Sequence, residues 1–120
     1  MIGKIASTAV YVEDQQRAKE FWTEKIGFEV RSEDPLGPNA YRLEVAAPGA
    51  ETALAIYPKS YVLNWQELKP SIVFECDNVH ASYQWMKAQN IVFDEEPTEM
   101  NGITYASFRD EDDNVFLLKS

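Results

Sequence analysis

The chain has 120 residues, enough for one domain that buries a hydrophobic core without disulfides or a structural metal. Its 11 basic and 20 acidic residues give a net charge of −9, which repels nucleic-acid phosphates and anionic membranes. One cysteine cannot form an internal disulfide, no positively charged start precedes an apolar run, and no apolar stretch approaches about 18 residues. These features predict a soluble, cytoplasmic protein that binds neither nucleic acid nor membranes.

Residues 7–30 predict a strand, a capped helix and a second strand. Residues 5–12 are rich in β-branched and aromatic side chains, which favour a strand with two different apolar faces. Asp14 then stands where a helix N-cap is expected, and apolar residues follow at helical spacing. Gly27 comes directly after them, so we expect the helix to end there.

Residues 71–93 repeat this arrangement at a shift of 64 positions. Asn78 takes the place of Asp14 as an N-cap, and Trp85 takes the place of Phe21 on the helix. A period of about half the chain is too long for a solenoid repeat. We therefore predict a duplicated module.

Further strands complete the first module. Residues 33–39 contain two prolines and predict a turn-rich connection, and residues 41–46 and 52–57 predict two strands. Residues 58–70 lack periodicity and predict a linker. Module one is therefore β-α-β-β-β and occupies residues 1–57.

The second module, residues 71–120, has the same predicted order. Residues 94–98 predict an acidic loop, and Asn101-Gly102 is a strong signal for a two-residue hairpin turn. Residues 110–114 predict a tight acidic turn before a last strand. Together the two modules predict an α+β fold within a single domain, residues 1–120.

The paired plan resembles the glyoxalase, bleomycin-resistance and extradiol-dioxygenase superfamily, also called vicinal oxygen chelate proteins. The resemblance covers nearly the whole chain. It is most specific in the V-x-D-x-x-x-A-x-x-F-W-x-x-x-x-G-F run at residues 12–28 and the D-x-x-D-N pattern at residues 110–114. The resemblance implies two curved sheets around a cleft, helices outside, and pairing into a homodimer.

The resemblance also bears on metal binding. Metal-dependent members carry His, Gln or Glu ligands at four inward strand positions, which in this chain correspond to Ser7, Ala55, Ser71 and Leu117. These four do not form a plausible ligand set. His80 is the single histidine, so the chain also cannot supply the imidazoles of a two-His-one-carboxylate iron site. We predict no metal, no cofactor and no catalytic residue.

Alternation along the strands predicts which side chains face the cleft. The candidate ligand-binding residues are Ser7, Tyr11, Tyr57, Trp65, Ser71, Glu75, Tyr105, Ser107, Arg109 and Leu117. Aromatic faces with a few polar groups are typical of small-molecule sites, and the alternative is that these side chains fill a collapsed barrel. Glu75 favours a flat cation, whereas neutralisation of Glu75 by Arg109 favours neutral or zwitterionic ligands.

Two functional classes follow from these observations. The first is a metal-free binding protein like the bleomycin-resistance branch, a homodimer that sequesters a flat aromatic compound, with a cationic one favoured by Glu75. The second is a lyase, isomerase or dioxygenase-type enzyme of the same superfamily, using a divalent metal or Glu75 as a base. A silent family member that binds an unrelated metabolite is a third interpretation. We favour the first.

Overall fold

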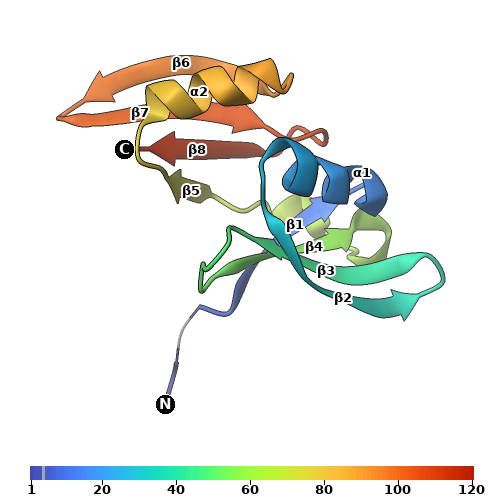
Figure 1. Cartoon of the computed structure of the whole chain (residues 1–120). Coiled ribbons are helices and arrows are strands. Elements are labelled where there is room, and N and C mark those ends of the chain that lie inside the picture. Colours follow the sequence, from blue (N-terminus) through green and yellow to red (C-terminus); the bar gives the residue numbers. More distant parts are fainter. Residues whose placement is uncertain (4) are drawn as a thin grey trace. The chain divides into compact units, whose positions relative to one another are not determined.

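The computed structural model describes residues 1–3 and 5–120, which form two compact units, residues 1–70 and 71–120. Each unit contains one four-stranded mixed sheet and follows the order β-α-β-β-β (Figure 1). The predicted α+β class and the repeated order of elements are thus confirmed. No helix in the described part of the chain is long and apolar enough to cross a membrane.

The first unit has the strand order β1-β4-β3-β2, in which β1 and β4 are parallel and the other pairs antiparallel. Its strands are β1 (Ser7–Val12), β2 (Glu29–Gly37), β3 (Ala40–Ala46) and β4 (Ala53–Pro58). Its helices are α1 (Gln15–Glu20), the π-helix η1 (Phe21–Lys25), and the short 3-10 helices η2 (Lys59–Tyr61) and η3 (Trp65–Glu67). The linker predicted at residues 58–70 therefore begins with the last residue of β4 and then contains two single helical turns.

The first helix begins and ends where its sequence signals lie. The Asp14 carboxylate accepts hydrogen bonds from the backbone N–H groups of Gln16 and Arg17, at 2.9 and 3.2 Å, which satisfies two donors of the first turn. Gly27 follows η1 with a φ of 93°, a conformation that favours glycine. The helix packs over β3 and β4, and Val10 and Trp22 are fully buried in this core.

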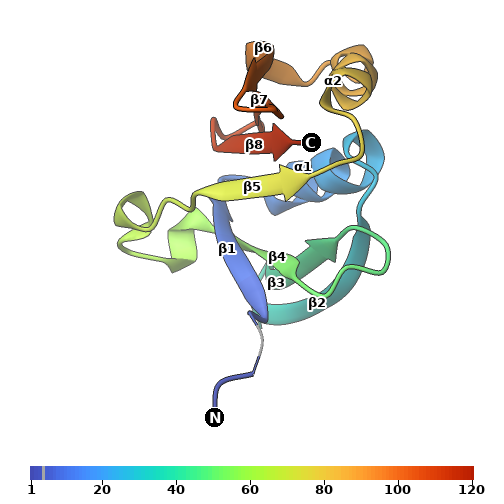
Figure 2. The ribbon, with the colours of Figure 1, turned by 90° about the vertical axis from the view of Figure 1, so that its left-hand side faces the viewer.

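The second unit has the order β5-β8-β7-β6, again with its first and last strands parallel (Figure 2). Its elements are β5 (Ile72–Glu75), α2 (Val79–Ala88), β6 (Val92–Met100), β7 (Ile103–Arg109) and β8 (Val115–Lys119). The Asn78 side chain caps α2 by accepting from the Ala81 N–H at 3.0 Å. Asn101 and Gly102 have φ angles of 53° and 81°, as the predicted hairpin turn between β6 and β7 requires.

Two predicted loops are strands. Residues 33–37 belong to β2, where Pro35 pairs with Tyr41, and residues 94–98 belong to β6. The prediction was wrong because proline and clustered charges usually indicate loops. Both segments are edge strands with register irregularities, and an edge strand tolerates proline because one of its sides makes no ladder hydrogen bonds.

Candidate ligand-binding site

One face of the sheet in the first unit carries three of the predicted ligand-binding residues. The parallel register pairs Ala9 with Ala55 and Tyr11 with Tyr57, so these side chains and that of Ser7 share a face. The Tyr11 and Tyr57 rings are stacked, with centroids 6.2 Å apart and an interplanar angle of 29°. The opposite face of the sheet is the core covered by α1. The two half-buried rings therefore lie on this face beside two small residues, and the Arg42 guanidinium lies 5.9 Å from the centroid of the Tyr57 ring.

Arg42 joins the polar groups of this face. Its Nε donates to the Tyr57 hydroxyl at 2.9 Å, and its Nη2 donates to Ser7 Oγ at 3.4 Å. Its Nη1 forms an ion pair with the Glu44 carboxylate. The hydrogen bonds to Glu44 and Tyr57 raise the pKa of the Arg42 guanidinium, which stays charged. The pair Arg42 and Glu44 adds no net charge to the face.

Arg42 and Glu44 were missed in the sequence-based prediction. Both alternate along β3 with Leu43 and Val45, which are buried in the core. That alternation is the signal that could have found them, because polar residues between buried ones lie on the opposite face of a strand. Glu44 pairs directly with Ala55 in the register, so a carboxylate does lie beside that position.

The sheet of the second unit gathers another set of predicted residues. Leu117 pairs with Ser107, and Lys119 lies between Glu75 on β5 and Tyr105 on β7. All five therefore share one face. Ser107 is buried, whereas Glu75 is exposed.

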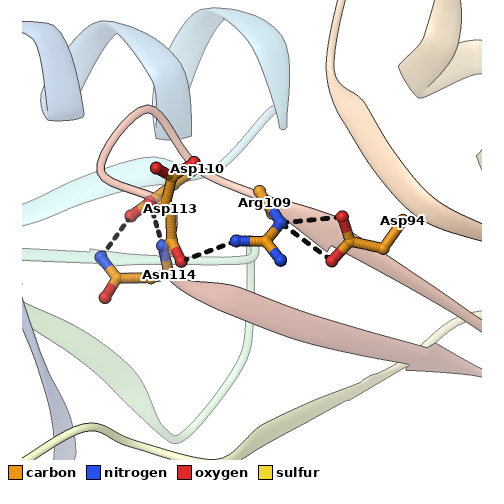
Figure 3. Close-up of polar contacts among 5 residues, drawn as sticks. All are labelled: Asp94, Arg109, Asp110, Asp113 and Asn114. Atoms are coloured by element: carbon orange, nitrogen blue, oxygen red, sulfur yellow. Dashed lines mark hydrogen bonds and ion pairs between the residues drawn. The ribbon is translucent and has the colours of Figure 1, made fainter.

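Arg109 does not neutralise Glu75, contrary to one of the two alternatives above. Its Nε donates to both oxygens of Asp94, at 2.8 and 2.9 Å, and its Nη1 donates to the Asp113 carbonyl at 3.4 Å (Figure 3). In the sheet, Arg109 pairs with Val115 at the start of β8, whereas Glu75 pairs with Lys119 at the end of β8. The ion-pair partner of Arg109 is thus Asp94, on the adjacent strand β6.

Two predicted residues lie outside the strands. Ser71 immediately precedes β5, and Trp65 lies on η3 in the segment between the two sheets. The Lys59 ammonium lies 4.3 Å from the centroid of the Trp65 indole ring, a cation–π contact. In the first unit, Trp65 therefore packs over a lysine.

The chemistry at the superfamily's metal positions does not fit a metal. The side chains of Ala55 and Leu117 have no donor atom, and Ser7 accepts a hydrogen bond from the cationic Arg42. A lone pair of Ser7 Oγ is thus already used by a cationic donor. Within residues 1–3 and 5–120, no three His, Cys, Asp or Glu side chains are grouped closely enough to hold a metal ion.

A separate groove of about 550 Å³ lies beside the start of α1. Its lining includes Glu13, Asp14, Lys19, Glu33, Tyr41 and Tyr61. Lys19 is paired with Glu33, Lys59 lies 3.6 Å from Glu13, and Asp14 caps the helix. These charged groups of the groove therefore have partners within the first unit, as Arg42 and Glu44 do on the face that carries the two stacked tyrosines.

Comparison with known proteins places these features in context. Residues 4–118 match the model of the Glyoxalase/Bleomycin resistance protein/Dioxygenase superfamily. The uncharacterized protein YetH of Bacillus subtilis (strain 168) is 52% identical over 119 residues, which cover 99% of both chains.

Solved structures of similar proteins share the fold of this chain. A member of the same superfamily from Sphaerobacter thermophilus DSM 20745 is 28% identical, with a TM-score of 0.88 and coverage of 98% of this chain and 97% of that one. TnmS3, an antibiotic binding protein from Streptomyces sp. CB03234, is 27% identical, with a TM-score of 0.81 and coverage of 98% and 94%.

Proposed function

Because the chain belongs to the Glyoxalase/Bleomycin resistance protein/Dioxygenase superfamily, we propose that it is a metal-free binding protein that sequesters a flat aromatic compound. The observation that carries this proposal is the pair of stacked rings, Tyr11 and Tyr57, on the sheet face away from α1. Such rings offer a large apolar contact area with polar groups at the edge, which is the usual composition of a small-molecule site. The similarity to an antibiotic binding protein supports the same class of function.

The charge of the protein favours a cationic ligand. The net charge of −9 raises the local concentration of cations, and the exposed Glu75 supplies a carboxylate on the sheet of the second unit. A cation–π contact contributes about 0.5 to 2 kcal/mol and a charge-assisted hydrogen bond about 1.5 to 3. We therefore expect a flat cation to bind more tightly than a flat anion, without a metal.

The test is a titration followed by tryptophan fluorescence. Bleomycin-like compounds, planar aromatic cations and planar aromatic anions are added to the parent protein and to Glu75→Gln. We expect micromolar binding of cations to the parent protein and a loss of about tenfold in the variant, equivalent to about 1.4 kcal/mol. The anions serve as the matched control and should bind weakly to both proteins.

Two results would contradict the proposal at different levels. Equal cation affinity in both proteins, or a preference for anions, would show that Glu75 does not contribute to binding and that the ligand is not a cation. Failure of every planar aromatic compound to bind would overturn the binding function itself.

A further inference from the structure

The three nitrogens of the Arg42 guanidinium donate to two kinds of group, one carboxylate and two hydroxyls. Glu44 is a carboxylate and can only accept, whereas Tyr57 and Ser7 carry hydroxyl groups that can both accept and donate. Arginine donates and never accepts, so each hydroxyl oxygen must accept the hydrogen bond from Arg42. The proton of each hydroxyl is then left for another partner.

The structure shows no such partner within the described part of the chain. Neither the Tyr57 nor the Ser7 hydroxyl donates a hydrogen bond to an acceptor among residues 1–3 and 5–120. Both side chains are half-buried and project from the sheet face that α1 does not cover. Nε and Nη2 belong to one edge of the guanidinium, the edge that often binds the two oxygens of a carboxylate, so the two hydroxyls lie next to each other.

We propose that the Tyr57 and Ser7 hydroxyls, positioned by Arg42, donate together to one acceptor oxygen of the bound ligand. This inference rests on the proposed binding function and specifies its ligand as a planar aromatic compound with an oxygen attached to the ring system. The ring lies against the stacked tyrosines, and the oxygen accepts a hydrogen bond from each hydroxyl. Arg42 is a positioning residue, because it holds both oxygens and leaves both protons directed at the ligand.

The test compares two probes of the same shape, 9-fluorenone and fluorene, which differ in a carbonyl oxygen. Binding of each to the full chain is measured by quenching of tryptophan fluorescence. One neutral hydrogen bond contributes about 0.5 to 1.5 kcal/mol, so we expect fluorenone to bind about tenfold more tightly than fluorene when both hydroxyls donate. Tyr57→Phe and Ser7→Ala should each weaken fluorenone binding about three- to tenfold and so reduce its preference over fluorene.

Two further variants complete the design. Tyr41→Phe removes a hydroxyl at a tyrosine that lines the separate groove beside α1, and it should change neither affinity. Arg42→Lys keeps the charge but lacks the planar fork that holds two oxygens at once, so it should reduce the preference for fluorenone over fluorene. A purely structural role of Arg42 would instead weaken both probes equally. Circular dichroism on each variant confirms that it is folded.

The outcomes separate the inference from the function on which it rests. Equal binding of both probes to the parent protein, or equal loss of both in Tyr57→Phe, would overturn the paired-donor site and leave the aromatic binding function intact. Failure of both probes to bind the parent protein would overturn both.

Discussion

At the scale of single residues, Asp110 is the buried carboxylate whose ionisation links pH to stability. Burial raises the pKa of the Asp110 carboxyl, although hydrogen bonds from Asn114 (Figure 3) and from the Asp112 N–H oppose this effect. A carboxyl with a raised pKa in the folded state contributes stability below its unfolded pKa of about 3.9 and loses it as the pH rises through the folded value.

Asp110→Asn should remove this dependence. We expect the free energy of unfolding of the parent protein, relative to that of Asp110→Asn, to fall as the pH rises above about 4. Urea denaturation at a series of pH values measures this difference. Asp113→Asn changes the charge by the same amount at an exposed position and is the control. Parallel stability curves for the parent protein and Asp110→Asn would show that Asp110 titrates alike in both states.

Residues on the first sheet show what alternation can and cannot predict. Strand alternation correctly placed Ser7, Tyr11 and Tyr57 on one face, because the side-chain period of a strand is fixed by its backbone. It could not predict that Arg42 reaches all three polar neighbours or that Arg109 bonds Asp94. Those contacts depend on which strands are adjacent and on side-chain conformation, neither of which follows from local sequence.

At the scale of elements, Gln15 connects α1 to the sheet beneath it. Its Nε2 donates to the carbonyls of Tyr41 and Ile56, at 2.6 and 2.9 Å, and its Oε1 accepts from the Tyr41 N–H at 3.0 Å. Gln15→Ala leaves one backbone donor and two carbonyls without these bonds, so we expect a loss of about 1 to 3 kcal/mol in the free energy of unfolding. Urea denaturation measures it.

The neighbouring residue provides a matched control. Gln16 is exposed, and among the residues that the structure describes its side-chain amide donates to Glu20 alone, at 3.3 Å. Gln16→Ala should therefore change stability by less than about 0.5 kcal/mol. If the two variants lost the same stability, the contact of Gln15 with the sheet would contribute nothing beyond helix formation.

The edge strands explain why some elements were not predicted. β2 and β6 contain Pro35 and Pro97 together with clustered carboxylates, which in a sequence have the same signature as a loop. On a sheet edge these residues discourage pairing with another chain. The interior strands and both helices lack this conflict between signals, and their positions were predicted within a few residues.

At the scale of the whole molecule, the proposed function predicts weak metal retention. The resemblance equates Ser7, Ala55, Ser71 and Leu117 with the ligand positions of metal-dependent members, and none of these four side chains is a His, Gln or Glu. Protein exposed to nickel, zinc, iron(II) or manganese and then desalted should retain well under one equivalent per chain, measured by atomic emission. Stoichiometric retention together with glyoxalase or ring-cleavage activity would favour the enzyme interpretation.

Assembly provides a second test at this scale. Proteins that this chain resembles often complete their clefts as two-fold dimers, and we expect the same assembly here. Light scattering at micromolar concentration should give about twice the 13.7 kDa mass of one chain. A mass of one chain throughout the concentration range would contradict a dimer and require that each ligand be bound within a single chain.

The parallel pairing of β1 with β4 and of β5 with β8 also determines the order in which the chain can fold. Antiparallel hairpins such as β6–β7 form between neighbours in about 1 to 10 μs, whereas each parallel pair joins the first and last strands of its unit. Closing such a long loop costs entropy before any contact is gained, so these pairs form late and separate early. Ser7 lies on β1 and Tyr57 on β4. A ligand bound to both residues would therefore hold together the strand pair of the first unit whose members are farthest apart in the sequence, and would slow the unfolding of this unit.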